Sequence, residues 1–530
     1  MDDDVTDADV AIVGYGPVGQ VLAVLLARRG WRVTVVERWP QTYPMPRAVA
    51  FDSEAARILA TAGVGESISE FGEPSGEYMW KNAAGQVLLH IEASEHGHCT
   101  WPDSTSMYQP GLEAALTARG AQLPTLRVWR GHAAVRLVDH GDRVELVAKA
   151  DHDERVITAR WVVGCDGANS FVRDQIGTSL TDFSFAHDWL ICDVVLNEPT
   201  TFSPNNLQIC DPARPRTAVS AGPGHRRWEF MRMAGETVDE LNKVETAWRL
   251  LGPAGVTPGN ATLRRHAVYT FQAQLADRWR AGRLLLAGDA AHLMPPFAGQ
   301  GMCSGFRDAA NLAWKLDLVL AGRAADGLLD TYAEERRAHV RHAIGMSVNL
   351  GKVICQTDPA AAADRDAVMI ASRERGLSKA QPRAAVQPLT GGLLRREANR
   401  AGPAGQLTPQ ATVARGDLVG LFDEVVGLGF VLLATEDVRD WLDANLLSFM
   451  DDLGARIVWV LPAGTPPERA DADAVVDVDD VYLPYLARNA ARAVLVRPDF
   501  YAFGAASDRD GLTALLEDLR GQLAAPVPVS

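Results

Sequence analysis

The sequence is poor in cysteine and in long apolar runs, and each shortage argues against a class of protein. Its 530 residues hold six cysteines, none of them in a C-x-x-C pair and none after Cys355. Scattered thiols of this kind argue against a disulfide framework and a zinc site, so we expect a cytoplasmic protein without a bound metal. No run reaches the roughly 20 apolar residues of a membrane-spanning helix. The acidic start MDDDVTDAD also lacks the layout of a signal peptide.

Positive charge is scarce as well. The chain has 52 Lys and Arg against 67 Asp and Glu, which gives a formal net charge of −15. A nucleic-acid or anionic-membrane partner needs clustered Lys and Arg, so we expect neither. Hydrophobic residues make up 47% of the chain and charged residues 22%, as in ordinary globular proteins. The length predicts two or three domains.

What the sequence does contain begins with a strand, a glycine-rich turn and a helix. The stretch VAIVGYGPVGQVLAVLLARRGWRVTVVER covers residues 10–38. Its apolar pattern predicts a strand over 9–13, a helix over 17–29 and a second strand over 32–36. This order is typical of the first βαβ unit of a dinucleotide-binding domain.

Three glycines in this turn fit the pattern G-x-G-x-x-G. Gly14 permits the sharp turn, Gly16 lets the backbone approach a pyrophosphate, and Gly19 lets helix and strand pack closely. Free amides at the helix start would then face the phosphate charge. Glu37 is placed to bond ribose hydroxyls and disfavours a 2′-phosphate, so the resident nucleotide is expected to be FAD or NAD. A packing turn without a ligand is the alternative.

A second glycine-rich turn lies far downstream. RLLLAGDAAHLMPPFAGQGMCSGFRDAANLAWKL covers 283–316, with a strand that stops at Gly288 and Asp289 and a helix that opens near Gly301. Two such turns in one chain indicate a ligand with two separated ends, and FAD is such a ligand. Asp289 could accept from ribityl hydroxyls, and the helix dipole could stabilise negative charge on the reduced flavin. The alternative for Asp289 is a helix cap.

The rest of the chain divides into further segments. Short strand-like runs with Pro- and Gly-rich turns over 181–275 indicate a second, sheet-based domain, and a new alternation of strands and helices begins near 415. Further helices are predicted over 53–62, 111–119, 303–321 and 326–348. The predicted domains are a nucleotide-binding domain (1–75, 105–180 and 276–376), a substrate-binding domain (76–104 and 181–275), a linker (377–411) and a small C-terminal α/β domain (412–530).

Taken together, the motifs resemble those of the single-component flavoprotein aromatic hydroxylases, and most of all the 3-(3-hydroxyphenyl)propionate hydroxylase group. The similarity is dense over about 8–355, and the tail over 377–530 resembles the thioredoxin-like domain of phenol-hydroxylase relatives. Without C-x-x-C, that tail has no dithiol chemistry. The resemblance implies an α/β fold: a Rossmann-like FAD-binding domain with an inserted sheet-based substrate domain and a small thioredoxin-like C-terminal domain. The segments that carry it are VAIVGYGPVGQVLA, PRAVAFDSEAARIL, YQPGLEAAL, VVGCDGANSFVR, AGDAAHLMPPFAGQGMCSGFRDAANLAWKL, CDPARPRTAVSA, RRWEFMRM and LLDTYAEERR.

The resemblance also implies which residues contact FAD. Many relatives carry Leu-Asn or Tyr-Asn where GQGMCSG has Met302 and Cys303, so backbone contacts are expected there. The implied cofactor-binding residues, together with those of the two turns, are Gly14, Gly16, Pro17, Val18, Gly19, Glu37, Arg38, Arg47, Gln109, Asp166, Gly167, Arg173, Gly288, Asp289, Pro295, Gly299, Gly301 and Met302.

Such enzymes, by this resemblance, run two half-reactions. NAD(P)H reduces FAD, O2 then forms a flavin C4a-hydroperoxide, and a phenol gains a hydroxyl from it. The cofactor does the chemistry, while the protein supplies position and excludes water. Pro295 would offer its carbonyl at the flavin edge. No second Rossmann turn is present, so NAD(P)H is expected to visit a groove, and the choice between NADH and NADPH stays open.

A phenol is easier to oxidise as phenolate, which asks for a base. Asp193 is our candidate catalytic residue, and His225, Glu229 and Tyr269 are the others. We also expect an aromatic pocket for the substrate ring and an arginine that forms an ion pair with a substrate carboxylate. The residues proposed for these two roles are Trp189, Trp228 and Phe230 for the pocket, and Arg214, Arg226 and Arg227 for the carboxylate.

Several alternatives remain open from sequence alone. The substrate is expected to be a 3-hydroxyphenylpropionate-type acid or a larger phenolic natural product. The same scaffold could instead insert oxygen beside a ketone or form an epoxide on a polyketide-like substrate, or act as a FAD oxidoreductase that does not oxygenate. A homodimer and a monomer are both compatible with the acidic tail.

Overall fold

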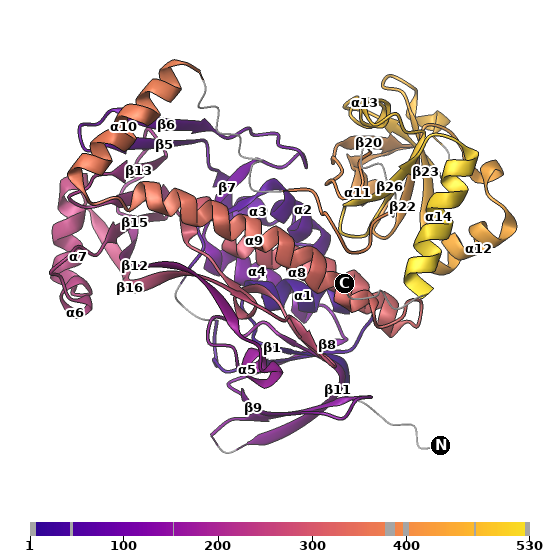
Figure 1. The fold of residues 1–530 in the computed structure, drawn as a ribbon, viewed down its shortest axis with the longest axis horizontal. Helices are drawn as coiled ribbons and strands as arrows, with labels where there is room; N and C mark the ends of the chain where they lie inside the picture. Colours follow the sequence, from indigo (N-terminus) through magenta and orange to yellow (C-terminus); the bar gives the residue numbers. More distant parts are fainter. Residues whose placement is uncertain are drawn as a thin grey trace.

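The computed structural model describes residues 7–42, 46–151, 153–376, 387–395, 402–470 and 473–524. Three large sheets organise these residues into a Rossmann-like domain, a sheet domain inserted into it, and a small thioredoxin-like domain (Figure 1). A minor sheet joins β3 (Ala50–Asp52), β7 (Ser104–Met107) and β4 (Gly72–Pro74). No helix in the described ranges combines the length and the apolar composition needed to cross a membrane.

The first sheet brings the glycine-rich turns to one edge. Its order is β17-β18-β11-β1-β2-β8, and β18, β11, β1, β2 and β8 run parallel to one another, whereas β17 is antiparallel to β18. The carboxyl ends of parallel strands meet at the same edge, where ligands bind in this class of fold. The strands are β1 (Ala8–Val13), β2 (Val33–Glu37), β8 (Leu126–Arg130), β9 (Ala133–Asp139), β10 (Val144–Lys149), β11 (Glu154–Gly164), β17 (Arg280–Ala281) and β18 (Leu284–Leu286).

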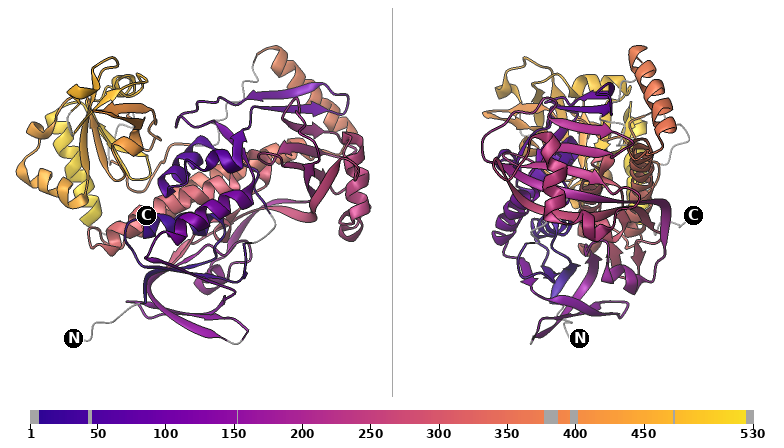
Figure 2. Two further views of the ribbon diagram at one scale, coloured as in Figure 1. Left: turned by 180° about the vertical axis from the view of Figure 1, so that it is seen from behind. Right: turned by 90° about the vertical axis from the view of Figure 1, so that its left-hand side faces the viewer.

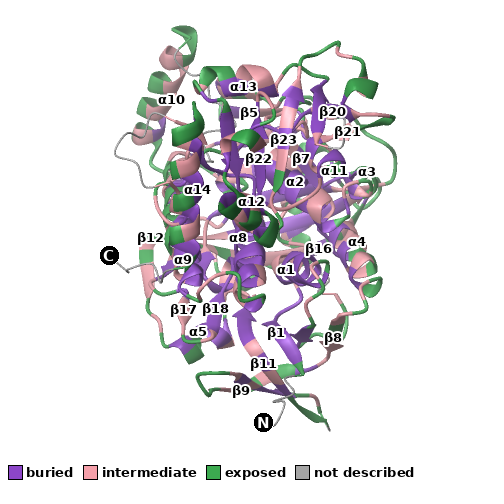
Figure 3. Ribbon diagram, turned by 90° about the vertical axis from the view of Figure 1, so that its right-hand side faces the viewer, coloured by how far each residue is buried: buried purple, intermediate pink, exposed green. Residues whose placement is uncertain are grey.

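Helices with apolar faces cover this sheet. Figure 1 shows α1 and α8 side by side above it, with the β9–β10 ribbon below. Residues of β1 and α1 are almost wholly buried, as Figure 3 shows, because the first βαβ unit forms the centre of the main hydrophobic core. The helices of this domain are α1 (Pro17–Ala27), α2 (Ser53–Ala62), α3 (Ile68–Phe71), α4 (Gln109–Ala121), α5 (Phe171–Ile176), α8 (Gly301–Leu320) and α9 (Leu328–Ile354). The next helix, α10 (Pro359–Glu374), packs on β6 (Val87–Glu92) of the second sheet.

The second sheet has the order β19-β16-β12-β15-β14-β13-β5-β6. Its two faces have different partners. Leu190, Cys192, Trp228 and Phe230 pack with α6 (Val238–Leu241) and α7 (Val244–Leu251), whereas Trp189, Ile191 and Met231 belong to the main core of the nucleotide-binding domain. The strands are β5 (Glu77–Asn82), β6 (Val87–Glu92), β12 (Leu180–Leu196), β13 (Asn206–Cys210), β14 (Arg216–Ser220), β15 (Arg226–Met231), β16 (Ala261–Ala276) and β19 (His292–Leu293).

The third sheet forms the small C-terminal domain, which lies beside the nucleotide-binding domain in the left view of Figure 2. Its order is β21-β20-β24-β23-β22-β25-β26. Trp314 and Leu318 of α8 belong to its hydrophobic core, so α8 joins the two domains. Its elements are β20 (Thr412–Arg415), β21 (Leu418–Leu421), α11 (Phe422–Val425), β22 (Val431–Ala434), α12 (Ala444–Leu453), β23 (Arg456–Leu461), β24 (Ala474–Asp477), α13 (Tyr482–Arg488), β25 (Ala493–Val496), β26 (Ala502–Ala506) and α14 (Arg509–Ala524).

The segment expected to be a linker, 377–411, is described over 387–395 and 402–411; the remainder lies outside the described residues. Leu389 and Leu393 are buried, and the Leu393 amide donates to Glu335 Oε1 on α9. Gln410 Nε2 donates to Asp423 in the C-terminal domain. The described parts therefore pack against both domains.

Candidate functional site

The first glycine turn is shaped by the backbone around it. Gly14 has φ +100°, and a Cβ there would lie 2.4 Å from the carbonyl oxygen of Cys165. A Cβ on Gly19 would lie 2.2 Å from the carbonyl oxygen of Gly14, so α1 touches β1 at this point. Both positions therefore require glycine for the close approach of two backbone segments.

Gly16 differs from Gly14 and Gly19 because the space that a side chain would occupy is open. It has φ −74° and caps the N-terminus of α1 without a side-chain hydrogen bond, and an added Cβ would meet no atom within 4 Å. Pro17 takes the first helical position, where a missing N–H costs nothing. The turn thus leaves open space in front of uncapped helix amides, which fits a bound pyrophosphate.

Glu37 and Arg38 follow the second strand beside this turn. The Glu37 carboxylate is largely buried and accepts from the amides of Tyr15 (2.7 Å) and Trp39 (2.8 Å). Each carboxylate oxygen has a second lone pair, so acceptor capacity remains for a ribose hydroxyl. The Arg38 guanidinium is exposed and lies 5.7 Å from the Trp39 ring.

The second turn packs directly on the first. Gly288 has φ +63°, and a Cβ there would lie 3.0 Å from Val18 Cγ2 of α1. A Cβ on Gly305 of α8 would lie 2.4 Å from the same methyl group. The two predicted segments, distant in the chain, therefore form one continuous surface with Val18 at their junction.

Arg47 and Asp289 meet at this surface. The Arg47 Nη1 atom lies 2.9 Å from Asp289 Oδ2, and both side chains are partly exposed. Gln109 holds the Arg47 segment in place, because its Oε1 atom accepts from the amides of Arg47 (2.8 Å) and Ala48 (2.9 Å). The position of Gln109 thus fixes the backbone beside Asp289.

Asp166 holds the turn before α5, and Arg173 of α5 contacts the second glycine turn. Asp166 accepts from Ser170 Oγ (2.5 Å) and from the Val172 amide (3.1 Å) at the start of α5. Gly167 has φ +82° with open space in front of it. Arg173 is buried, and its Nη1 atom donates to the carbonyl of Ala290 (3.2 Å). The guanidinium therefore binds the backbone of the turn directly after Asp289.

The end of the second turn opens α8. Pro295 is buried, Gly299 has φ +65°, and α8 begins at Gly301 without a side-chain cap, with Met302 in its first turn. Phe297 lies between these residues and contacts the second sheet, with ring centroids 5.7 Å from Trp189 and 6.0 Å from Phe271. An aromatic wall therefore joins the turn to the sheet.

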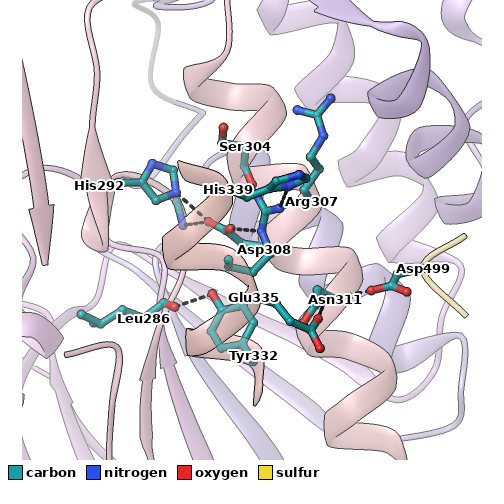
Figure 4. A network of polar contacts seen from close by, with 12 residues as sticks. Leu286, His292, Ser304, Arg307, Asp308, Asn311, Tyr332, Glu335, His339 and Asp499 are labelled. Atoms are coloured by element: carbon teal, nitrogen blue, oxygen red, sulfur yellow. Dashed lines mark hydrogen bonds and ion pairs between the residues drawn. The ribbon is translucent and has the colours of Figure 1, made fainter. Parts of the chain in front are cut away.

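A buried acid that the sequence interpretation missed holds the second turn on α8 (Figure 4). Asp308 has no exposed surface and accepts from the Gly288 amide (3.0 Å), His292 Nε2 (2.7 Å) and Arg336 Nε (2.8 Å). Burial raises the pKa of this carboxyl, but the charges of His292 and Arg336 outweigh burial and lower it below its usual value. Its one sequence signal is an acid two turns into the helix that follows the glycines.

Asp308→Ala is expected to weaken FAD binding without touching the ligand surface. Breaking a buried ion pair leaves Arg336 uncompensated and destabilises a protein by about 3–5 kcal/mol. The Gly288 amide and His292 then lose their common acceptor. Isothermal titration of the apoprotein with FAD checks this, with Asp326→Ala on the surface as control. Unchanged affinity and melting temperature in Asp308→Ala would contradict the assigned role.

The candidate base Asp193 is already engaged. Its two carboxylate oxygens lie 2.6 Å and 3.1 Å from the Arg227 guanidinium, and Arg265 Nε lies 3.5 Å away. Arg227 also donates to the carbonyls of Pro46 (2.8 Å) and Arg47 (2.6 Å), so this pair ties the second sheet to the segment beside the turns. A cavity borders the pair, lined by Pro46, Ala48, Tyr108, Gln109, Asp193 and His225.

Comparison with known proteins agrees with this architecture. The FAD binding domain family matches residues 7–347, and the HcaD C-terminal domain matches 405–522. The chain is 39% identical over 525 residues to a probable NADH-specific resorcinol 4-hydroxylase of Rhodococcus jostii (strain RHA1), covering 98% of this chain and 96% of that protein. It is 35% identical over 514 residues to a 3-(3-hydroxy-phenyl)propionate/3-hydroxycinnamic acid hydroxylase of Mycobacterium sp. (strain JLS), covering 95% and 90%.

Solved structures share the whole fold. A ternary complex of aklavinone-11 hydroxylase with FAD and aklavinone has a TM-score of 0.78 at 23% identity, covering 98% of this chain and all of that one. OxyS anhydrotetracycline hydroxylase from Streptomyces rimosus has a TM-score of 0.76 at 25% identity, covering 96% and 98%. The chain belongs to the FAD-dependent aromatic hydroxylases. It is an enzyme whose cofactor is FAD, with a reduced nicotinamide and O2 as co-substrates.

Proposed function

We propose that this enzyme hydroxylates a small phenol with NADH and O2, and that the two glycine turns hold the FAD between them. NADH, a proton, O2 and the aromatic C–H would give NAD+, water and the new C–OH. The packing of Val18 on Gly288, which joins the two turns into one surface, is the observation that carries the proposal. NADH is preferred because the relative from Rhodococcus jostii is named NADH-specific.

Each part of the surface has a proposed task. The amides after Gly16 would receive the pyrophosphate, Glu37 the adenosine ribose, and Asp289 the ribityl chain, with Arg47 beside it. The first turn of α8, from Gly301, would lie near the ring system. Bound FAD supplies the electron transfer and the oxygen chemistry.

The rest of the chain excludes water and positions the substrate. The ring of Phe297, buried against Trp189 and Phe271, closes the sheet side of the surface and would shelter the reacting atoms. The Pro295 carbonyl remains our candidate contact at the flavin edge. A phenol would bind beside this wall, at the face of the second sheet that carries Trp189. We also propose that the protein acts in the cytoplasm.

A coupled assay tests this function. Purified enzyme should oxidise NADH faster than NADPH when resorcinol or 3-(3-hydroxyphenyl)propionate is added, and the product should gain one oxygen atom that comes from 18O2. An ester or epoxide product would instead indicate oxygen insertion beside a ketone or at a double bond. Nicotinamide oxidation that no phenol stimulates, with no oxygenated product, would leave a FAD oxidoreductase and overturn the proposal.

A further inference from the structure

One buried carboxylate on the second sheet has no partner. Glu229 lies on β15 with 6% of its surface exposed, and its carboxylate makes no hydrogen bond or ion pair with any other described residue. Burial raises the pKa of its carboxyl to about 7; the Arg227 charge opposes this rise and the Asp193 charge adds to it. A buried acid whose side chain has no partner is costly to the fold, which makes Glu229 a candidate for ligand binding or catalysis.

The register of the sheet places Glu229 on the face toward the nucleotide-binding domain. Side chains alternate along a strand, so Glu229 shares its face with Arg227 and Met231. Arg227 donates to the carbonyls of Pro46 and Arg47, next to the Arg47–Asp289 pair. Met231 pairs in register with Trp189, which contacts Phe297 of the second turn. Glu229 therefore lies between two segments that border the proposed flavin site.

The arginines that could bind a substrate carboxylate already have partners within the protein. Arg227 is held by Asp193, and Arg214 by Glu236 at 2.5 Å and 3.0 Å. Arg226 lies on the opposite face, 3.7 Å over the Phe202 ring, and donates to Asn205. Arg265 donates to the Pro46 carbonyl and faces Asp193. A carboxylate brought here would add a negative charge to a buried surface that already carries Glu229.

We propose that Glu229 accepts the hydroxyl proton of an uncharged phenol and that this site selects resorcinol-like substrates over phenolic acids. This rests on the proposed function and names its substrate class. The phenol O–H bond breaks and an O–H bond forms on Glu229, leaving phenolate and a neutral carboxylic acid. No electrons leave the protein in this step, and the phenolate ring is the better partner for oxygen transfer.

The groups around Glu229 define how its charge depends on pH. Arg227 shares its strand, Asp193 lies on β12, Arg265 lies on β16, and Tyr78 on β5 is close enough that the Glu229 charge contributes to raising the tyrosine pKa. The free enzyme binds a proton at Glu229 below about pH 7 and loses it above. A base acts when deprotonated, so kcat/KM is expected to rise with pH up to about 7 and then level off.

Glu229→Gln tests the proposal because it keeps the shape and removes the base. Hydroxylation of resorcinol should fall by about 100- to 10,000-fold, and the rise of kcat/KM toward pH 7 should disappear. FAD content should stay at the wild-type level, and the melting temperature at pH 8 should rise because a buried unpaired charge is gone. Glu245→Gln, an exposed glutamate of the same domain, is the control and should leave all four readouts unchanged.

Substrate preference gives a second, independent readout. The wild-type enzyme should use resorcinol with a kcat/KM at least about tenfold above that for 3-(3-hydroxyphenyl)propionate. Repulsion of about 1.4 kcal/mol between the substrate carboxylate and Glu229 is enough to give this factor of ten. Glu229→Gln should narrow this ratio. Equal use of both substrates by the wild type, or a Glu229→Gln variant with wild-type activity and pH profile, would overturn the inference. If the wild type hydroxylates no phenol at all, the proposed function itself fails.

Discussion

Gly16→Ala is expected to yield a folded protein that purifies without FAD. The protein places no atom within 4 Å of the added methyl group, and φ −74° suits alanine, so the melting temperature of the apoprotein should not fall. The same methyl group occupies the space where a pyrophosphate would approach the helix amides. Affinity for FAD should drop by at least about 100-fold, which corresponds to a loss of about 2.8 kcal/mol or more of binding free energy. Absorbance of the purified protein and titration with FAD measure this.

Gly14→Val should remove FAD by a different route. The valine side chain would start 2.4 Å from the carbonyl oxygen of Cys165 and would require φ +100°, so the turn itself must move. Loss of FAD should therefore come with loss of stability. Gly345→Ala on α9 is the matched control for Gly16→Ala. A methyl group there likewise meets no atom within 4 Å, and this variant should keep its FAD. Full FAD occupancy in Gly16→Ala would show that the first turn does not hold the phosphates.

The parts of the fold that sequence predicted well are those set by local pattern. The helix expected over 53–62 is Ser53–Ala62, and the helix expected over 303–321 is Gly301–Leu320, because glycine, capping and apolar spacing act within a few residues. The first strand and helix are confirmed in the same way, with the helix ending at Ala27 instead of residue 29.

What sequence could not provide is the pairing of charges between distant segments. Sequence offers Asp193 as a candidate base because it does not reveal Arg227, whose guanidinium engages both carboxylate oxygens of Asp193 in the folded protein. Sequence gives little sign of the role of Asp308 because its three partners lie 16, 20 and 28 residues away, on other elements. Sequence names Glu229 only as one of four candidate bases, since whether its side chain has a partner is a property of the folded sheet. The sites that sequence suggested through glycine turns depend on backbone shape, which is local, whereas side-chain roles depend on tertiary contacts.

The C-terminal domain is joined to the second turn through buried charges. Arg307 of α8 donates to Gln300, the cap of that helix, and also to Asp52 and Glu54 (both 2.6 Å). Glu54 in turn accepts from the hydroxyl of Tyr501 in the C-terminal domain (2.8 Å). The tail therefore supports the start of α8, where the flavin ring is proposed to lie, even though it has no dithiol of its own.

Glu335→Ala is expected to weaken the contact between the C-terminal domain and α8. Glu335 on α9 is fully buried, and its Oε2 atom lies 2.7 Å from Arg497 Nη2 of the C-terminal domain and 2.9 Å from Lys315 Nζ of α8. Removing it leaves Lys315 without a counter-charge and Arg497 with Asp499 alone. Breaking a buried pair costs about 3–5 kcal/mol. The free energy of unfolding measured with urea should fall by that amount, whereas Glu334→Ala, one residue away and exposed, should change it little.

The same cluster predicts an acid-sensitive junction. Burial raises the pKa of Glu335, but the charges of Arg497 and Lys315 outweigh it and hold the pKa well below its ordinary value of 4.5. A carboxyl whose pKa is lowered in the folded state stabilises the protein at every pH above its ordinary pKa. That contribution is lost progressively as the pH falls from the ordinary pKa through the lower, folded-state pKa. Wild-type stability should therefore decline below about pH 4.5, and Glu335→Ala should show a shallower decline because this contribution is already missing. Parallel pH profiles for the two proteins would mean that Glu335 does not carry the charge that holds the C-terminal domain against α8.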